Sequence, residues 1–296
     1  MNIGLAQHKT KKEIYEMITR FFPKRASVRR ILLAVFFILL PITQAFAGEN
    51  LFNSASLIRE EASLLGDEAL DLLRTPADTE HNGLFGTAMV VGAGGIAYIF
   101  DENIRKPVRE HGNQTLDKIA NVGNTLGDPL VHIGLAGIVY GGGLLAGSEK
   151  WQETGKMLGE AVLLADAATL VLKGSIGRGR PYVNGDRGSF KPFQFDSDYD
   201  SMPSMHTASS FAAASVMAGV TESVWAKAAY YSAATLVGLS RMVDDQHWAS
   251  DVLLGAAIGE LCGRIVARHH AKGKQKFVLA PIISGNSAFL GLTAAW

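Results

Sequence analysis

Residues 203–221 read PSMHTASSFAAASVMAGVT, and this stretch decides the kind of fold that the chain adopts. Ser204 follows a proline and precedes a run of small and apolar residues, so it is a natural N-cap for a helix. Apart from His206, the helix carries no acid or base. Alanine and glycine let two helices approach closely. The stretch therefore predicts one closely packed helix of an all-α bundle.

Four other stretches have the same small-residue character and predict further helices of the bundle, at residues 129–147, 157–172, 224–240 and 250–269. Only residues 129–147 approach the length and apolar purity of a membrane-spanning segment. Hydrophobic residues make up 48% of the chain, which is high for a soluble protein and low for a transporter with many spans. Periodicity leaves membrane burial and a soluble bundle both open.

The flanking regions differ from these helices. Residues 54–74 predict an amphipathic helix that ends at Thr75-Pro76, with a polar linker to about Gly83. An apolar segment follows at residues 84–100, and the charged residues 101–112 predict a short helix and a loop. Residues 113–127 predict another amphipathic piece. At the other end, two apolar runs around a turn near residues 284–286 predict a short C-terminal β-hairpin.

The N-terminus has the composition of an export signal. Residues 1–30 carry eight Lys and Arg against Glu13 and Glu16, and residues 31–47 form the apolar run ILLAVFFILLPITQAFA. A basic segment, an apolar core and a small-x-small ending predict a signal peptide cleaved before Gly48, with an uncleaved membrane anchor as the alternative. The basic side then stays in the cytoplasm and the remainder is exported.

The predicted domains are therefore a signal or anchor at 1–47, an amphipathic helix and linker at 48–83, a helical domain at 84–272 and a hairpin extension at 273–296. Without residues 1–47 the formal charge is −6, which argues against nucleic acid as a partner. The single cysteine, Cys262, excludes an intrachain disulfide and is interpreted as a small core residue.

Chemistry-bearing residues gather in three clusters in the last third of the chain, and we begin with the third cluster. His247 and Asp251 are four residues apart, so on a helix they share one face. The carboxylate can then accept the Nδ1 proton of the imidazole and leave Nε2 free as a nucleophile or base. Arg241 lies six residues upstream, within reach of a phosphate at that imidazole. Taken alone, the spacing favours the simpler interpretation of a surface His–Asp pair.

The second cluster is the start of the helix at Ser204. Free backbone N–H groups at Met205 and His206 point at an anion bound to a helix N-terminus, where the dipole also favours negative charge. The His206 side chain stands in this first turn, where it can donate a proton to a leaving oxygen. The simpler interpretation is a capped helix with an incidental histidine.

The first cluster, KGSIGRGRP at residues 173–181, supplies two cations. Arg180 offers a planar fork for two phosphate oxygens, and Lys173 offers a point charge. Lys173 also ends an apolar helix, so it can equally serve as a partner of the helix dipole.

Together the three clusters resemble the signature of the type 2 phosphatidic acid phosphatase family. That signature is Lys, six residues, Arg-Pro; then Pro-Ser-Gly-His; then Ser-Arg, five residues, His, three residues, Asp. The chain matches it over about residues 129–269, at Lys173, Arg180-Pro181, Pro203-Ser204, His206, Ser240-Arg241, His247 and Asp251. The departure is Met205 in place of glycine, which puts a side chain beside the pocket and removes the freedom of glycine to adopt a positive φ.

The resemblance implies a bundle of about six core helices and a phosphomonoesterase that needs no metal and no other cofactor. His247 is implied as the nucleophile that forms a phosphohistidine, Asp251 as the residue that orients it, and His206 as the acid and then the base. The implied phosphate-binding residues are Lys173, Arg180, Ser204, Met205 and Arg241.

Several functions fit these residues. The first is a phosphatase of the bacterial envelope, in the inner membrane with its site toward the periplasm, acting on a lipid phosphate such as phosphatidate or polyprenyl pyrophosphate. The second is a soluble periplasmic acid phosphatase for small phosphoesters. A vanadate-dependent haloperoxidase shares the same anion pocket but is usually longer, and a non-catalytic envelope protein is disfavoured because every catalytic side chain is retained. The expected partners are the phosphorylated substrate and the membrane, while protein partners are unknown.

Overall fold

The computed structural model describes residues 51–194, 196–273, 277–284 and 287–294. The signal or anchor predicted at residues 1–47 lies outside the described residues. The chain divides into two compact units, residues 1–59 and 60–296. Of the first unit, only residues 51–59 are described, and they form the beginning of a helix.

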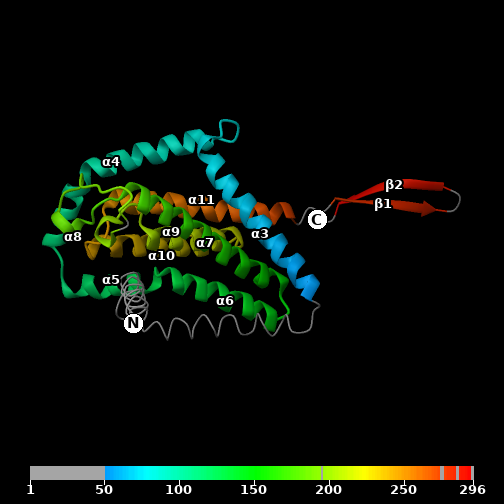
Figure 1. The fold of residues 1–296 in the computed structure, drawn as a ribbon. Helices are drawn as coiled ribbons and strands as arrows, with labels where there is room; N and C mark the ends of the chain where they lie inside the picture. The colour runs from blue at the N-terminus through cyan, green and yellow to red at the C-terminus, as the bar shows by residue number, and fades with distance from the viewer. Residues whose placement is uncertain (1–50, 195, 274–276, 285–286, 295–296) are drawn as a thin grey trace, which may run out of the picture. The chain divides into compact units, whose positions relative to one another are not determined.

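Residues 51–273 fold into helices joined by loops (Figure 1). This confirms the predicted helical fold class. The long helices are α3 (Leu51–Arg74), α4 (Gly83–Glu110), α5 (Gln114–Leu126), α6 (Pro129–Leu145), α7 (Glu149–Ile176), α9 (Met205–Gly219), α10 (Val224–Val243) and α11 (Ala249–Gly273). The short ones are η2 (Thr75–Ala77), α8 (Pro181–Asn184) and η3 (Ser197–Tyr199). Strands β1 (Phe277–Ser284) and β2 (Ser287–Ala294) pair antiparallel, with Phe277 opposite Ala294.

Helix α9 contains most of the stretch 203–221, and it packs against α6, α7, α10 and α11. Its small residues permit this, because a β-carbon added at Gly259 of α11 would lie 2.1 Å from the carbonyl oxygen of Ala208. One added at Gly255 would lie 2.4 Å from the carbonyl oxygen of Ser204. Helices α9 and α11 therefore meet backbone to backbone, and this contact sets the start of α9 beside the start of α11.

Helix α4 differs from the prediction, since residues 101–110 continue the apolar helix instead of forming a short helix and a loop. The reason is long-range. Asp101 is fully buried and accepts hydrogen bonds from Ser250, while Arg105 binds the carboxylate of Asp245 with Nε 2.6 Å from Oδ1. The charged residues of this segment, which suggest a loop in the sequence, are thus bound by partners in α11 and in the loop before it. Arg105 binds that loop, and Asp101 binds the first turn of α11.

Helix α7 also exceeds its prediction. It begins at Glu149 and not at residue 157, and it extends past residue 172 to Ile176. Gly177 ends it with φ near 61°, a left-handed conformation that glycine adopts without strain. Lys173 consequently lies in the last helical turn, and the rest of the first cluster, from Gly177 on, follows the end of the helix.

Helix α4 has an exposed apolar surface. Within the described residues, α4 is the one helix long and apolar enough to cross a membrane, and none of its most apolar window is buried. Helices α5 and α6, bent by 55° at their junction, pass the same test as a pair. The exposed large apolar side chains of α4 are Leu84, Phe85, Met89, Val91, Ile96, Ile99 and Phe100.

Candidate active site

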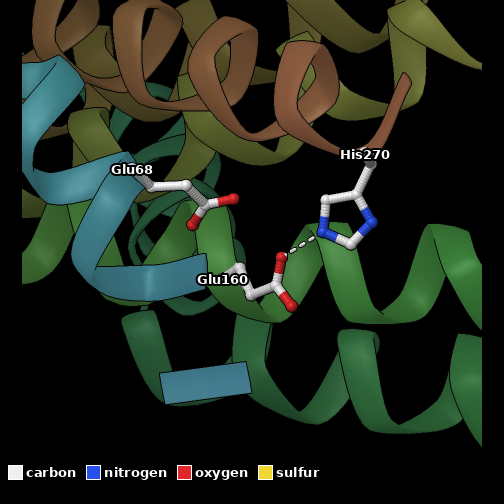
Figure 2. Close-up of side chains that lie close together, drawn as sticks. All are labelled: Glu68, Glu160 and His270. Atoms are coloured by element: carbon white, nitrogen blue, oxygen red, sulfur yellow. Dashed lines mark hydrogen bonds and ion pairs between the residues drawn. The ribbon is translucent and has the colours of Figure 1, made fainter. Parts of the chain in front are cut away.

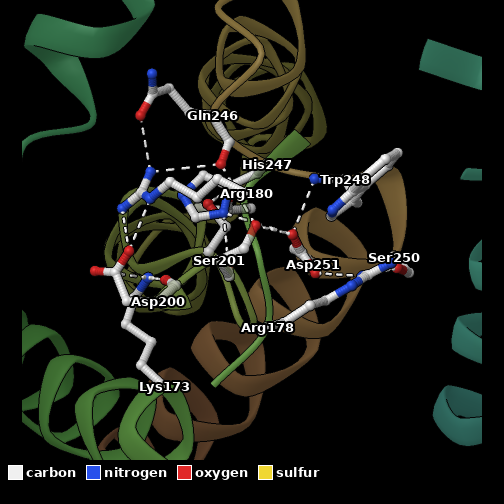
Figure 3. A network of polar contacts seen from close by, with 12 residues as sticks. Lys173, Arg178, Arg180, Asp200, Ser201, Gln246, His247, Trp248, Ser250 and Asp251 are labelled. Atoms are coloured by element: carbon white, nitrogen blue, oxygen red, sulfur yellow. Dashed lines mark hydrogen bonds and ion pairs between the residues drawn. The ribbon is translucent and has the colours of Figure 1, made fainter. Parts of the chain in front are cut away.

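The fold brings the three sequence clusters together. Lys173 comes from the end of α7, His206 from the first turn of α9, Arg241 from the last turn of α10, and His247 from the loop before α11. The charges of Lys173, Arg180 and Arg241 act on both imidazoles. Figure 3 shows the polar network around Lys173, Arg180 and His247. Three cations and two histidines therefore share one site.

The position of His247 differs from the prediction. Helix α11 begins at Ala249, so His247 precedes the helix and does not share a helical face with Asp251. Its Nδ1 lies 2.6 Å from the carbonyl oxygen of Ser201 and 3.7 Å from Oδ2 of Asp251. The prediction that Asp251 accepts the Nδ1 proton is therefore wrong, because the acceptor is the Ser201 carbonyl. That carbonyl can only accept, so Nδ1 keeps its proton and Nε2 of the neutral ring is left with a lone pair.

Asp251 supports His247 indirectly. The carboxylate is fully buried and accepts hydrogen bonds from Arg178 Nη1 at 2.6 Å, from Ser201 Oγ at 2.5 Å and from the Trp248 N–H at 2.9 Å. It thereby holds Ser201, whose carbonyl binds the imidazole, and the backbone next to His247. Asp251 is thus connected to His247 through Ser201 and Trp248.

Arg178 is a site residue that the sequence reasoning missed. Its guanidinium is fully buried between two carboxylates, with Nη1 bound to Asp251 and Nη2 2.8 Å from Oδ2 of Asp101. Nη1 also donates to Ser250 Oγ at 2.7 Å. The available signal was a third cation inside KGSIGRGRP, between Lys173 and Arg180. Nothing local distinguishes a buried arginine there from one that faces the substrate.

Arg180 is held beside the pocket by its own partners. Its Nε donates to Asp200 Oδ1 at 2.7 Å, and its Nη1 donates to Gln246 Oε1 at 2.8 Å. The ammonium group of Lys173 donates to the backbone carbonyl of Asp200. Asp200 therefore ties both cations of the first cluster to the loop before α9.

Arg241 has a buried donor without a hydrogen-bond partner among the described residues. Its Nη1 binds Oδ1 of Asn124, a residue of α5 that sequence reasoning also missed. Its Nε is buried and has no hydrogen-bond partner among the described residues. Because a buried N–H without an acceptor costs free energy, this donor points to an anion that completes the site.

The start of α9 has the predicted position but different capping. Ser204 is the N-cap residue, yet its Oγ accepts from Thr207 Oγ1 at 2.8 Å and makes no cap hydrogen bond to the backbone. Its own N–H donates to the carbonyl of Asp251 at 3.0 Å. Met205 is absent from the described non-glycine residues with positive φ, so replacing glycine there costs no backbone strain. The first N–H groups of α9 remain available to an anion.

Burial and neighbouring cations make both imidazoles poor bases. Burial lowers the pKa of His247 well below its ordinary value, and Lys173, Arg180 and Arg241 lower it further. Burial also lowers the pKa of His206 well below its ordinary value, followed by the charges of Arg241 and His247. Both rings are therefore neutral near pH 7 when no anion is present, as a nucleophilic imidazole requires. A bound phosphate dianion adds negative charge and favours a proton on His206.

The lowered pKa of Lys173 predicts that substrate binding weakens at alkaline pH. Burial lowers its pKa to about 8, so the cation is present below pH 8 and is lost as the pH rises through that value. We expect KM for a phosphoester to rise above about pH 8. Lys173→Arg should move this rise to higher pH because arginine keeps its charge. Steady-state kinetics across the pH range check this, with Lys191→Arg as the control. An unchanged alkaline rise in Lys173→Arg would assign it to another group.

Comparison with known proteins agrees with this arrangement. Residues 155–274 match the PAP2 superfamily, and this range contains every site residue predicted from the sequence. The chain is 34% identical over 188 residues to the lipid A 1-phosphatase of Porphyromonas gingivalis. The aligned residues cover 62% of this chain and 38% of that protein. It is 32% identical over 131 residues to the lipid A 1-phosphatase of Rhizobium etli. The aligned residues cover 43% of this chain and 55% of that protein. The chain thus spans well under two thirds of both curated relatives.

Two solved structures are similar as well. The crystal structure of Aquifex aeolicus LpxE has a TM-score of 0.46 and 24% identity, and covers 57% of this chain and 95% of that one. The transmembrane PAP2 type phosphatidylglycerolphosphate phosphatase of Bacillus subtilis has a TM-score of 0.44 and 20% identity, and covers 70% of this chain and 96% of that one. With the motif residues gathered in one site inside the matched range, residues 155–274 belong to the PAP2 superfamily, the family of type 2 phosphatidic acid phosphatases.

Proposed function

We propose that this protein is a phosphoric monoester hydrolase that removes phosphate from a phosphorylated lipid of the bacterial envelope. The observation that carries the proposal is one site in which Lys173, Arg180 and Arg241 surround two neutral imidazoles, with the buried Nε of Arg241 left without an acceptor. This is the charge pattern that stabilises a phosphoryl group during transfer.

The proposed reaction has two steps. Nε2 of His247 attacks phosphorus, the bond to the leaving oxygen breaks, and His206 gives that oxygen its proton. Water then attacks the phosphorus of the phosphohistidine while neutral His206 takes a proton from that water. The bond between phosphorus and Nε2 of His247 breaks, and inorganic phosphate leaves. Lys173, Arg180, Arg241 and the N–H groups at the start of α9 hold the phosphoryl oxygens throughout. Every step uses groups of the protein, so the reaction requires no metal at this site.

The lipid nature of the substrate is inferred from the apolar surface. Helices α4 and α5 supply Asp101 and Asn124 to the site network, and both carry exposed apolar side chains. A substrate phosphate held in the site can leave its acyl chains against that surface. Two relatives named lipid A 1-phosphatase make lipid A 1-phosphate the first substrate to test, beside phosphatidate and polyprenyl pyrophosphate.

We propose an inner-membrane location with the site toward the periplasm, residues 84–272 forming the catalytic domain. The support is the export signal predicted for residues 1–47, together with the apolar surface of α4 and of the bent pair α5–α6. Fractionation of expressing cells checks the location. Recovery of all activity in a salt-washed soluble periplasmic fraction would instead favour the small-ester acid phosphatase.

The substrate assay also tests the independence from metals. Purified protein is given lipid A 1-phosphate, phosphatidate, polyprenyl pyrophosphate and p-nitrophenyl phosphate, each with and without EDTA, at a temperature well below unfolding. We expect release of phosphate from at least one lipid at an initial rate that EDTA does not change. A rate that EDTA abolishes and a divalent ion restores at once would contradict the mechanism.

His206→Ala separates the acid from the nucleophile. The variant should retain far more activity on p-nitrophenyl phosphate than on an alkyl phosphate, because only the alkyl oxygen needs a proton as it leaves. We expect a loss of about 10²-fold to 10⁴-fold on the alkyl phosphate. The ratio of kcat values on the two substrates measures the effect. Equal losses on both would show that His206 is not the acid.

A further inference from the structure

A second polar cluster lies far from the active site and takes no part in the proposed reaction. Glu68 of α3, Glu160 of α7 and His270 of α11 place their ligand atoms within 4.8 Å of one another. Figure 2 shows the three side chains converging from three helices. His270 and Ser250 are separated by 20 residues of α11, which at 1.5 Å per residue puts about 30 Å between this cluster and the active site.

The imidazole of His270 is held as metal-binding histidines are held. Its Nε2 faces Glu160, while its Nδ1 lies 2.6 Å from Oε1 of Glu153 on the other side of the ring. A carboxylate on the far nitrogen fixes the ring and its tautomer, and this carboxylate–histidine–metal arrangement is typical of metal sites. With Nδ1 donating to Glu153, Nε2 carries the lone pair of the neutral ring, beside Glu160 and within 4.8 Å of a carboxylate oxygen of Glu68.

The burial of the cluster concentrates negative charge. Glu68 is fully buried, with both carboxylate oxygens shielded from solvent, and Glu160 is 9% exposed. Glu153 adds a third carboxylate behind the ring. Two buried carboxylates side by side destabilise each other's charged form. A divalent cation bound by one oxygen of each carboxylate and by the imidazole would lower this repulsion.

We propose that Glu68, Glu160 and His270 form a binding site for a divalent transition-metal cation, with Zn²⁺ as its ligand and Glu153 as the residue that orients the imidazole. Imidazole together with carboxylates suits Zn²⁺, whereas Mg²⁺ and Ca²⁺ prefer oxygen ligands alone. The ion ties α3 to α7 and α11, so its effect is on stability and not on the phosphoryl transfer. The three residues stand 92 and 110 positions apart in the chain, and no local spacing reveals them.

The test uses the full chain, purified in detergent, stripped with EDTA and dialysed. We expect titration calorimetry to give one Zn²⁺ per chain, and Zn²⁺ at about 100 times Kd to raise Tm by about 5 °C. Mg²⁺ should do neither. Glu153→Gln should weaken Zn²⁺ binding by about 10-fold to 100-fold. Glu160→Gln and His270→Ala should weaken it further and abolish the shift in Tm.

The matched control is the neighbouring histidine. His269 pairs with Asp71, its Nε2 2.8 Å from Oδ2, outside the proposed ligand set. His269→Gln should keep the affinity for Zn²⁺. Equal loss in His269→Gln and His270→Ala, or equal uptake by wild type and Glu160→Gln, would overturn the site. Because a variant can fail to fold, wild type is also loaded with Co²⁺. A spectrum without the visible bands of Co²⁺ bound by imidazole would equally overturn it.

The alternative occupant is a proton. A protonated His270 bridging Glu153 and Glu160 would hold the helices together without any metal. In that case wild type takes up no Zn²⁺ and its Tm does not respond to the ion. The outcome is independent of the phosphatase assay, since phosphate release at the distant active site neither requires nor reports an ion here.

Discussion

Replacing His247 with alanine is expected to abolish phosphate release from every substrate. The Nε2 lone pair is the only nucleophile that the proposed mechanism supplies, and its ring is fixed by the Ser201 carbonyl at 2.6 Å. Loss of a catalytic nucleophile typically costs about 10⁴-fold or more in kcat. Steady-state and single-turnover assays of the purified variant measure the loss. A good leaving group should not rescue it, in contrast to His206→Ala.

Labelling gives the same prediction a second readout. Wild type quenched during turnover with a radiolabelled phosphoester should carry label on His247, and the variant should carry none. His111→Ala, at an exposed histidine whose Nδ1 contacts the Pro107 carbonyl, is the control and should behave as wild type. Label on His206 in place of His247 would show that the two roles are reversed.

Replacing Arg178 with methionine is expected to cause the largest loss of stability of any single substitution in the site. The guanidinium lies between the fully buried carboxylates of Asp101 and Asp251, with N–O distances of 2.8 and 2.6 Å. Removing it leaves two buried carboxylates without their cation, which costs about 3–5 kcal/mol. Because Asp251 holds Ser201, and Ser201 holds His247, activity should fall as well.

Denaturant unfolding of the variant measures this loss, with Arg187→Met as the control. The guanidinium of Arg187 lies over the ring of Tyr98, 5.6 Å from its centroid, and it is not one of the partners of the two buried carboxylates. In an Asp101→Asn background, the further cost of Arg178→Met should be smaller, because one of the two charges has gone. A variant as stable as wild type would show that the buried carboxylates find other partners.

The sequence alone determined the helical class and predicted most of the residues that the fold brings together in the candidate site. Small-residue helices and a motif with fixed spacing are local properties, and the fold brings Lys173, His206 and His247 to one site as that motif implies. Their gathering in one site could be predicted because the three clusters together resemble a family signature, whereas the spacing within any one cluster leaves a simpler structural interpretation open.

The sequence did not determine which partner each side chain has. The i, i+4 spacing of His247 and Asp251 predicted a direct hydrogen bond, but helix α11 starts two residues too late and the Ser201 carbonyl takes the proton. That acceptor is 46 residues away in the chain, in a loop whose course depends on Arg178, Arg180 and Asp200. Backbone carbonyls carry no sequence signature, so only the tertiary structure can reveal such a contact.

Tertiary structure alone also decided the fate of the buried charges. Asp101 looks like part of an exposed polar stretch until α4 is packed against α11, and Glu68, Glu160 and His270 look unrelated until α3, α7 and α11 meet. Burying a charge is favourable only when an opposite charge or a hydrogen-bond partner is brought to it. Those partners come from distant segments, and their arrangement is a property of packing that local sequence does not encode.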